Sequence, residues 1–339
     1  MATERLRMRE AARRALDDEM AADADVIVLG EDVATAGGPF KVTEGLLEKY
    51  GERRVIDTPI SEAGFLGAAV GAASTGLRPV VEIMFIEFIG VAFDQLVTEA
   101  AKVRYLSRGK VACPLVVRAT VGAGLGFGCQ HSQILDGWFR GTPGLKLCIP
   151  ADSASMYGLL RAAVRDDDPV VFLEHKAMYG NRGEVTTGEA GIFEIGRAAV
   201  VVPGSDVTVV GSGLTVGVAR QAAAGAGPSM EVVDLRTLVP WDRETVLESV
   251  GRTGRLVTVE EGPCSGGWGA DIVAHVATHL HGRLQAPPLR VTSPDVPIPF
   301  AEALEQRYLP TPELLAQQVA ELVATGERVA PWWESEVLV

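Results

Sequence analysis

Apolar runs of strand length alternate with helical patterns along this chain, and that alternation limits its possible folds more than any other feature. Strands that are apolar along most of their length are buried on both faces, as in a parallel sheet covered by helices. The runs are residues 26–30, 77–85, 114–120, 144–150 and 169–175, then 206–213, 230–238 and 255–262. The pattern predicts an α/β protein with two doubly wound domains.

A polar, glycine-rich segment separates the two series of strands. Residues 180–191, GNRGEVTTGEAG, show neither a helical nor a strand period, which is typical of a linker. A chain of 339 residues is also long enough for two domains. We therefore expect an N-terminal domain over residues 1–185 and a C-terminal domain over residues 195–339. Within the first domain, the apolar period predicts one helix over residues 92–109.

The charge balance and the cysteines argue against several classes of protein. The net charge is −13, and no basic run offers a surface for nucleic acid. The four cysteines lie far apart, without CxxC or Cys/His ligand spacing, and predict reduced thiols. The sequence shows neither a signal-peptide pattern nor a membrane-spanning apolar run, so we expect a cytoplasmic protein. Its apolar fraction of 47% indicates that some surface is buried against other chains.

Glycine motifs that bind nucleotides are absent or incomplete. A dinucleotide-binding chain would have GxGxxG after its first strand, whereas residues 31–38 are EDVATAGG. A Walker-type phosphate loop does not occur in the sequence. Residues 122–128, GAGLGFG, follow a predicted strand and form either a backbone-exposing loop beside a ligand or a tight turn into a helix. The sequence leaves both interpretations open.

One acid, Glu62, stands at the front of a segment that is otherwise almost wholly small or apolar, DTPISEAGFLGAAVGAASTG (57–76). On spacing alone, Glu62 lies in the first turn of a helix, with Ser61 as the cap and the helix dipole favouring its charge. Alternatively, the glycines that follow let this helix approach another backbone closely, so that Glu62 lies in a dry cleft. A carboxylate in such a cleft can share a proton with a partner nitrogen, which is acid/base chemistry on a heterocycle.

Histidines and a run of acids supply further candidates. His131, in CQHSQ, follows the glycine-rich segment at a strand end, where ligands bind in open parallel sheets. His275 and His279 have the i, i+4 spacing of a metal-binding pair, but without a third ligand a helix face is favoured. The acids of RDDDP (165–169) are either solvated, aided by Arg165, or hold a cation with helix-end carbonyls; spacing alone favours solvation.

Ten segments, in order along nearly the whole chain, match one family pattern. They are GEDV (30–33), VTEGL (42–46), RVIDTPISEAGFLGAAVGAA (54–73), GLRPVVE (76–82), FDQ (93–95), AAKVRY (100–105), QHSQ (130–133), PGLKL (143–147), RDDDPVVFLEHK (165–176) and EVVDLRTLVPWD (231–242). The chain resembles the beta subunit of the thiamine-diphosphate-dependent first component of 2-oxo acid dehydrogenase complexes, in the transketolase superfamily. The resemblance implies an N-terminal pyrimidine-binding domain and a C-terminal transketolase-type domain.

An absent motif also fits this family. The GDG…N motif that holds Mg²⁺ and the diphosphate is missing from the sequence, and in such enzymes a separate alpha subunit carries it. The resemblance therefore implies that thiamine diphosphate is shared with an alpha subunit, which holds the Mg²⁺, in a heterotetramer of two alpha and two beta chains. It also implies transfer of the acyl group to the lipoyl domain of a partner acyltransferase.

The resemblance gives roles to three side chains. Glu62 matches the glutamate that hydrogen-bonds the aminopyrimidine ring, where a shared proton favours the imino tautomer that generates the ylide. Phe88, in MFIEF, matches the aromatic residue that packs on the pyrimidine ring; its alternative role is ordinary core packing. His131 matches the active-site histidine, which donates a proton as the acyl group moves to the lipoyl dithiolane.

The resemblance also implies a structural potassium ion. Its ligands in relatives are mostly backbone carbonyls, and they align with Leu115, Ala163, Val164, Asp166 and Asp168.

The sequence leaves the substrate open among pyruvate, a branched-chain 2-oxo acid and acetoin. The stretches MFIEFIG (84–90) and VGAGLGFGCQHSQ (121–133) are closer to acetoin-cleaving members. Two other hypotheses remain. One is a split transketolase-like carboligase that passes a two-carbon unit to an aldehyde or sugar. The other is a non-catalytic interaction subunit, against which intact Glu62, Phe88 and His131 argue. The missing glycine fingerprint disfavours a nicotinamide oxidoreductase.

Overall fold

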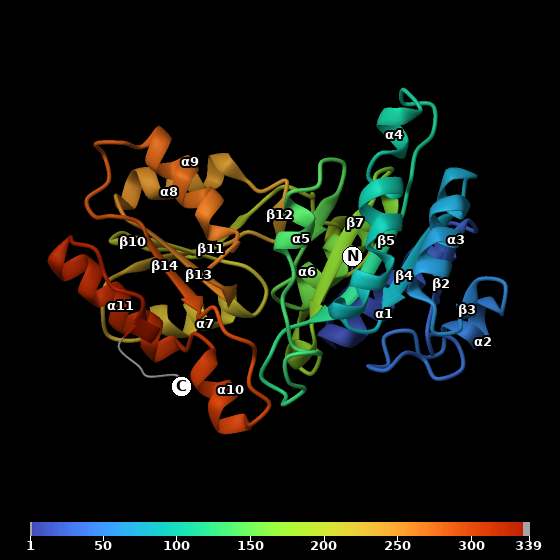
Figure 1. The fold of residues 1–339 in the computed structure, drawn as a ribbon, viewed down its shortest axis with the longest axis horizontal. Coiled ribbons are helices and arrows are strands. Elements are labelled where there is room, and N and C mark those ends of the chain that lie inside the picture. The colour runs from blue at the N-terminus through green and yellow to red at the C-terminus, as the bar shows by residue number, and fades with distance from the viewer. Residues whose placement is uncertain (1, 335–339) are drawn as a thin grey trace. The chain divides into compact units, whose positions relative to one another are not determined.

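The computed structural model describes residues 2–334, and the chain forms two compact units (Figure 1). The first unit comprises the described residues up to Gly122 together with Trp138–Ile195, and the second comprises Ala123–Gly137 together with the described residues from Gly196 onward. The predicted α/β class is confirmed, since each unit contains a largely parallel sheet with helices. The sequence did not predict that Ala123–Gly137 would group with the second unit.

The main sheet of the first unit is built from parallel strands in the order β6-β7-β5-β4-β2-β3. Every residue of β2, β5 and β7 is buried. Strands covered on both faces have no solvent side, which explains why these runs lack polar alternation. The bounds are β2 (Val26–Gly30), β3 (Val55–Asp57), β4 (Arg78–Ile83), β5 (Val116–Val121), β6 (Lys146–Cys148) and β7 (Val170–His175).

Helices and short helical turns connect these strands. Helix α1 packs against α6, where the guanidinium of Arg161 pairs with the buried carboxylate of Glu19 at 2.5 Å. The bounds are α1 (Met8–Ala22), α2 (Leu46–Tyr50), α3 (Glu62–Ser74), η1 (Ile86–Ala92), η2 (Gln95–Ala100), α4 (Val103–Leu106), α5 (Gly137–Arg140), α6 (Ser153–Arg165), η3 (Lys176–Met178) and η4 (Glu189–Gly191).

Two segments of the first unit differ from the sequence expectation. The helix predicted over residues 92–109 is interrupted, because η2 is a π-helical turn in which the Ala101 N–H donates to the Leu96 carbonyl at 3.0 Å. The polar segment 180–191 is not structureless: β8 (Arg182–Thr186) pairs antiparallel with β1 (Thr3–Arg7). The partner strand lies at the other end of the unit's sequence, so no local period could indicate the pairing.

A buried ion cluster lies inside the first sheet. Arg118 on β5 is 1% exposed, and its guanidinium donates to Glu82 Oε2 at 2.6 Å and to Glu174 Oε1 and Oε2 at 2.6 and 2.9 Å. The Tyr179 hydroxyl also donates to Glu174, at 2.7 Å. Burial raises the pKa of Glu82 and the carboxylate of Glu174 adds to this, although Arg118 opposes both effects. Two buried carboxylates therefore depend on one guanidinium.

The second unit has a five-stranded sheet in the order β14-β13-β10-β11-β9, in which β9 is antiparallel to β11 and the other pairs are parallel. Helices α8 and α9 lie on one side of this sheet and α7 and α11 on the other (Figure 1). Buried valines of the strands pack against Leu315, Val319 and Leu322 of α11. The bounds are β9 (Ala199–Val202), β10 (Val207–Gly211), α7 (Leu214–Ala223), β11 (Met230–Asp234), β12 (Thr237–Val239), α8 (Arg243–Thr253), β13 (Leu256–Pro263), α9 (Gly269–His279), β14 (Leu289–Ser293), α10 (Glu302–Tyr308), α11 (Pro312–Thr325) and η5 (Trp332–Glu334).

Within residues 2–334, no helix is long and apolar enough to span a bilayer. The four cysteines carry free thiols. Cys113 and Cys148 are buried, Cys264 is partly buried and Cys129 is exposed. Burial raises the pKa of the Cys113 thiol to about 11, so it behaves as an inert core residue.

Candidate active site

Glu62 begins α3 and is withdrawn from water. Its side chain is only 8% exposed, although an acid in the first turn of a helix is usually solvated. Ser61 occupies the N-cap position without making a side-chain capping hydrogen bond. Glu62 therefore starts the helix, where the dipole favours its charge, without the expected capping bond from Ser61, and it is also buried.

A second carboxylate, Glu31, lies beside Glu62 and was missed at the sequence level. It directly follows β2, and burial raises its pKa, followed by the charges of Glu62 and Asp32. Its Oε1 atom is buried and accepts no hydrogen bond from the described residues; the same holds for the hydroxyl of Thr58. Thr58 is held at this edge because its N–H donates to the Gly30 carbonyl at 3.0 Å. The GEDV motif contained the signal, since Glu31 follows a buried strand.

These atoms fit the polar edge of a heterocycle. Two carboxylates close together disfavour a second negative charge, so a proton is shared readily at this edge. Buried polar atoms without a partner within the chain are met by a ligand or by water in folded proteins. The arrangement around Glu62, Glu31 and Thr58 therefore suits a ring with nitrogen donors and acceptors, such as an aminopyrimidine.

Phe88 lies in η1, directly after β4, and is half-buried. Its ring meets Phe85 edge to face at 6.1 Å between centroids. Phe85 contacts Phe40 in the same way, and Phe40 contacts Tyr179 at 5.3 Å. Phe88 thus belongs to a row of aromatic rings that leads to the buried ion cluster. This row gives Phe88 a packing role, and its partial exposure leaves part of the ring available to a ligand.

The glycines of α3 do not bring another backbone close within the described chain. A Cβ at Gly64 would lie 2.7 Å from Ser61 Oγ, and one at Gly67 would lie 3.3 Å from Gln95 Cγ. A Cβ at Gly71 would meet no described atom within 4 Å. The expected close approach of two backbones is therefore wrong for residues 2–334. The glycines instead make room for side chains or lie at the surface.

In the second unit, His131 follows a loop that is built on glycine. Gly124, Gly126 and Gly128 have φ of +94°, +70° and +70°, a region that favours glycine. These glycines alternate with the exposed Leu125 and Phe127, and the next helix, α5, begins only at Gly137, so the segment is an exposed loop and not a tight turn into a helix. His131 is half-buried, and its N–H donates to the Gly128 carbonyl at 3.3 Å.

Two carboxylates of the second unit hold this loop. The Ala123 N–H donates to Glu261 Oε1 at 2.7 Å, and the Gly126 N–H donates to Glu305 Oε2 at 2.9 Å. Glu261 and Glu305 are 6% and 2% exposed. Neither residue was a candidate in the sequence, because their contacts join segments far apart in the chain.

The residues after His131 line a small cavity of about 90 Å³. On one side lie Ser132, Gln133, Ile134 and Leu135, and on the other Glu261, Gly262, Pro263, Val296, Pro297, Ile298 and Tyr308. The Ser132 hydroxyl is buried and has no hydrogen-bond partner among the described residues. Burial raises the pKa of Tyr308 to about 12, and the charge of Glu261 adds to this. Glu261 therefore borders the chain both before and after His131.

The acids of the RDDDP segment are compensated by basic side chains from elsewhere in the first unit. The Lys146 ammonium donates to both carboxylate oxygens of Asp166 at 2.7 and 2.6 Å, and Arg104 pairs with Asp168. Arg165, in contrast, pairs with acids of α1 and η4. Arg165 therefore pairs elsewhere and not with these acids, while the Asp167 side chain is 60% exposed, so solvation applies to that acid.

The five predicted potassium ligands lie around the end of α6 and the start of β7. Arg78 Nη1 donates to the carbonyls of Val164 and Asp166 at 3.2 Å each. The Ala163 carbonyl accepts from the Asp166 N–H, and the Leu115 carbonyl accepts from the first residue of β7. Each carbonyl keeps a second lone pair. The donor set therefore fits an alkali cation in kind, and two of its carbonyls already converge on a positive group.

His275 and His279 stack on each other in α9 at 4.0 Å between ring centroids. His279 Nδ1 lies 2.8 Å from the His275 carbonyl, and Trp241 meets His275 edge to face. Residues 2–334 contain no cluster of three or more His, Cys, Asp or Glu side chains that could hold a metal ion. The helix-face interpretation agrees with these contacts.

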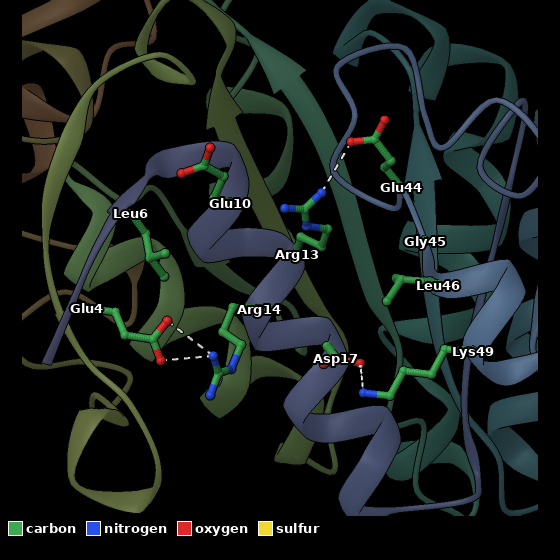
Figure 2. A pocket seen from close by; sticks show the side chains of 10 residues that line it. All are labelled: Glu4, Leu6, Glu10, Arg13, Arg14, Asp17, Glu44, Gly45, Leu46 and Lys49. Carbon is green, nitrogen blue, oxygen red and sulfur yellow. Dashed lines mark hydrogen bonds and ion pairs between the residues drawn. The ribbon is translucent and has the colours of Figure 1, made fainter. Parts of the chain in front are cut away.

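A cavity of about 340 Å³ in the first unit lies where α1 faces β1 and the start of α2 (Figure 2). Its charges are paired: Arg13 with Glu44 at 3.2 Å and Lys49 with Asp17 at 2.5 Å. Arg14 likewise pairs with Glu4. None of the predicted site residues lines this cavity. Its three basic side chains are already engaged in ion pairs at the surface, and no predicted site residue is present, so we do not assign the active site here.

Comparison with known proteins shows which family the chain belongs to. Residues 4–182 match the model of the transketolase pyrimidine-binding domain, and residues 196–315 match that of the transketolase C-terminal domain. A split-gene transketolase, solved as an inactive beta4 tetramer, has a TM-score of 0.75 at 27% identity, covering 94% of this chain and 98% of that one. A transketolase mutant from Pichia stipitis shares the fold with a TM-score of 0.68 at 18% identity; 98% of this chain and 48% of that one are covered.

Curated relatives are more similar in sequence. The pyruvate dehydrogenase E1 component subunit beta of Rhizobium meliloti is 45% identical, over 89% of this chain and 66% of that protein. The beta subunits of acetoin:2,6-dichlorophenolindophenol oxidoreductase from Cupriavidus necator and Bacillus subtilis are 44% and 42% identical. These matches cover 95% and 93% of this chain, and 99% and 96% of the relatives.

The fold and the two domain matches define the class, a thiamine-dependent enzyme chain of the transketolase type. Within that class, the chain belongs to the family of pyruvate and acetoin dehydrogenase beta subunits. The family inferred from the ten sequence segments is thereby confirmed. The relatives' names favour neither the carboligase nor the non-catalytic subunit.

Proposed function

We propose that this chain acts as the beta subunit of a thiamine-diphosphate-dependent dehydrogenase for a 2-oxo acid or acetoin, with Glu62 and Phe88 as its part of the cofactor site. The observation that carries the proposal is the buried carboxylate of Glu62 at the edge of a parallel sheet, beside an oxygen of Glu31 that accepts no hydrogen bond from residues 2–334. When bound, thiamine diphosphate supplies the carbon nucleophile for the keto group of the substrate.

Glu62 would hold a proton at a ring nitrogen of the aminopyrimidine. Its burial strengthens that hydrogen bond, because the local dielectric is lower than in water. The neighbouring charge of Glu31 disfavours a fully ionised pair, which keeps the proton at this edge. Phe88 would pack against the ring and exclude water from it.

His131 would serve the transfer of the acyl group. A protonated imidazole can donate a proton to the departing sulfur of a lipoyl dithiolane. The support for this role is the position of His131 directly after an exposed, glycine-rich loop, with the residue half-buried. A residue in this position is reached by a ligand more readily than a core histidine.

The proposal includes partners. The relatives are named as beta subunits, and one as part of an E1 component, which supports an alpha subunit and a lipoyl-bearing acyltransferase for this chain. The alpha subunit would hold Mg²⁺ and the diphosphate, since the corresponding GDG…N motif is missing from this sequence. A heterotetramer would then complete each active site.

A potassium ion at the end of α6 is part of the same proposal. The carbonyls of Leu115, Ala163 and Val164 and the residues Asp166 and Asp168 would hold it, and the bound ion would fix the turn into β7. Replacing K⁺ by Na⁺ in the buffer should lower the melting temperature of the alpha–beta complex. An unchanged melting temperature, with no thallium bound at this turn, would reject the potassium site.

The substrate is tested on the reconstituted alpha–beta pair. Pyruvate, a branched-chain 2-oxo acid and acetoin are each supplied with an artificial electron acceptor, and then with a lipoyl domain. Reduction of the acceptor with one of the three, and acylation of the lipoyl domain, are expected. Transfer to aldehydes alone would reject the dehydrogenase in favour of the carboligase. Full turnover by Glu62→Ala would indicate a non-catalytic subunit.

A further inference from the structure

We propose that Glu305, together with Glu261, is a positioning residue that fixes the glycine-rich loop ahead of His131 and thereby sets the geometry of acyl transfer. This inference rests on the proposed role of His131. Glu305 lies on α10, far along the chain from the loop, and it accepts the backbone N–H of Gly126 in that loop. Its effect on catalysis would therefore act through the loop.

The loop needs an external anchor because of its composition. Gly124, Gly126 and Gly128 all have positive φ, and glycine loses more conformational freedom on ordering than any other residue. No helix or strand includes residues 122–136. The order of this loop therefore depends on the contacts that its backbone makes with the rest of the second unit.

Glu305 and Glu261 supply such contacts at two points. Each accepts one backbone N–H, from Gly126 at 2.9 Å and from Ala123 at 2.7 Å. Hydrogen bonds to a carboxylate are shorter and stronger than those between neutral groups. Apolar contacts assist, since Phe300 packs against Gly128, with its Cδ2 only 3.2 Å from where a Cβ would lie. The loop is thus held at Ala123, Gly126 and Gly128, along its glycine-rich stretch.

Glu261 also constrains the chain beyond His131. It lines the 90 Å³ cavity with Ser132, Gln133, Ile134 and Leu135. Before His131 in the chain, Glu261 and Glu305 bind the backbone of Ala123 and Gly126. After His131, the chain packs beside Glu261 again. Displacing these anchors would shift His131 without altering the histidine itself.

The nature of Glu305 indicates a specific role for its carboxylate. It is 2% exposed, and its Oε1 accepts no hydrogen bond from the described residues. A buried carboxylate with an unmet oxygen is costly, and an apolar side chain would fill the same space at lower cost. A carboxylate is suited to this position because it must accept the Gly126 N–H.

The same helix offers a matched control. Glu302, one turn earlier on α10, is exposed and contacts Gln306 of its own helix at 3.1 Å. Glu302→Ala therefore removes an identical side chain from the same helix without touching the loop.

The test uses the assembled alpha–beta complex with Glu305→Ala, Glu305→Gln, Glu302→Ala and His131→Ala. Amide hydrogen exchange of residues 123–131 measures the loop directly, without cofactor. Single-turnover acylation of a lipoyl domain measures the His131 step, and exchange of the cofactor's thiazolium proton measures the Glu62 step.

For Glu305→Ala, we expect faster amide exchange in the loop and acyl transfer slowed about 10-fold to 100-fold, with thiazolium exchange unchanged. Glu305→Gln keeps an acceptor oxygen and should restore most of the transfer rate, and Glu302→Ala should match wild type. In the His131→Ala background, Glu305→Ala should add no further loss.

Three results would overturn the inference: wild-type loop exchange in Glu305→Ala, wild-type acyl transfer in that variant, or an equal loss of thiazolium exchange. A separate outcome concerns the proposed function. If His131→Ala itself transfers the acyl group at the wild-type rate, the proposed role of His131 in acyl transfer is wrong. Loop exchange in Glu305→Ala then shows whether Glu305 still anchors the loop.

Discussion

Replacing Arg118 by methionine should destabilise the chain more than most single substitutions. Arg118 is 1% exposed and lies 2.6 Å from a carboxylate oxygen of both Glu82 and Glu174. Removing one member of a buried ion cluster costs about 3–5 kcal/mol, because the remaining charges stay buried without compensation. Here two carboxylates lose their shared cation, so we expect a loss at the upper end of that range, about 5 kcal/mol.

The loss should depend on pH. Burial already raises the pKa of Glu82 in the folded chain, and without Arg118 it rises further. The folded variant then binds more protons than the unfolded chain, so its stability falls as pH rises from the carboxyl's ordinary value through the raised folded pKa. The destabilisation measured by urea unfolding should therefore be larger at pH 8 than at pH 5.

Matched variants separate the charge effect from lost packing. Arg13→Met removes an exposed arginine from the pair with Glu44, and we expect a loss below about 1 kcal/mol. Replacing Glu82 and Glu174 by leucine in the Arg118→Met background removes the uncompensated charges and should recover most of the stability. A loss below about 1 kcal/mol for Arg118→Met, or one that does not change between pH 5 and pH 8, would refute the reasoning.

Two further substitutions test local features. Burial and then the charge of Glu62 raise the pKa of Glu31, so wild-type stability falls as pH rises from the carboxyl's ordinary value through that raised pKa. Glu31→Gln should flatten this decline in melting temperature, and an unaltered slope would contradict the burial argument. Gly122→Ala should cost more than about 2 kcal/mol in urea unfolding, because its φ is +94° and the new Cβ would lie 2.0 Å from His175 Nε2. Gly109→Ala, with φ +77° and open space, should cost about 1 kcal/mol, and equal losses for the two would show that the clash is relieved.

Local patterns predicted the sheets well. The apolar runs at 26–30, 114–120 and 169–175 became β2, β5 and β7 with shifts of a residue or two, because burial on both faces leaves a clear compositional mark. The sequence could not predict the interruption of the helix in residues 92–109. The side chains of this segment have a regular helical period, and the π-turn is a feature of the backbone. The β1–β8 pair was also hidden, because it joins segments at the two ends of one unit.

For the candidate site as well, local motifs predicted some residues, and residues whose contacts depend on the fold were missed. Glu62, Phe88 and His131 were predicted from contiguous motifs and remain predictions. Glu31 lies in the GEDV motif, but no sequence pattern indicated a role for it. Only the fold shows that the ends of β2 and β3 lie at one edge of the sheet. Glu305 could not be found, since its partner is a backbone N–H that any sequence would supply.

The central claim is that the buried carboxylate of Glu62 controls proton transfer on thiamine diphosphate. The most direct measurement is the rate of thiazolium proton exchange in the alpha–beta complex, for wild type and Glu62→Gln. Glutamine keeps the size of the side chain but cannot hold the proton, so we expect exchange to slow by about 10²-fold to 10⁴-fold while the complex stays assembled. Equal exchange rates in the two intact complexes would contradict the account.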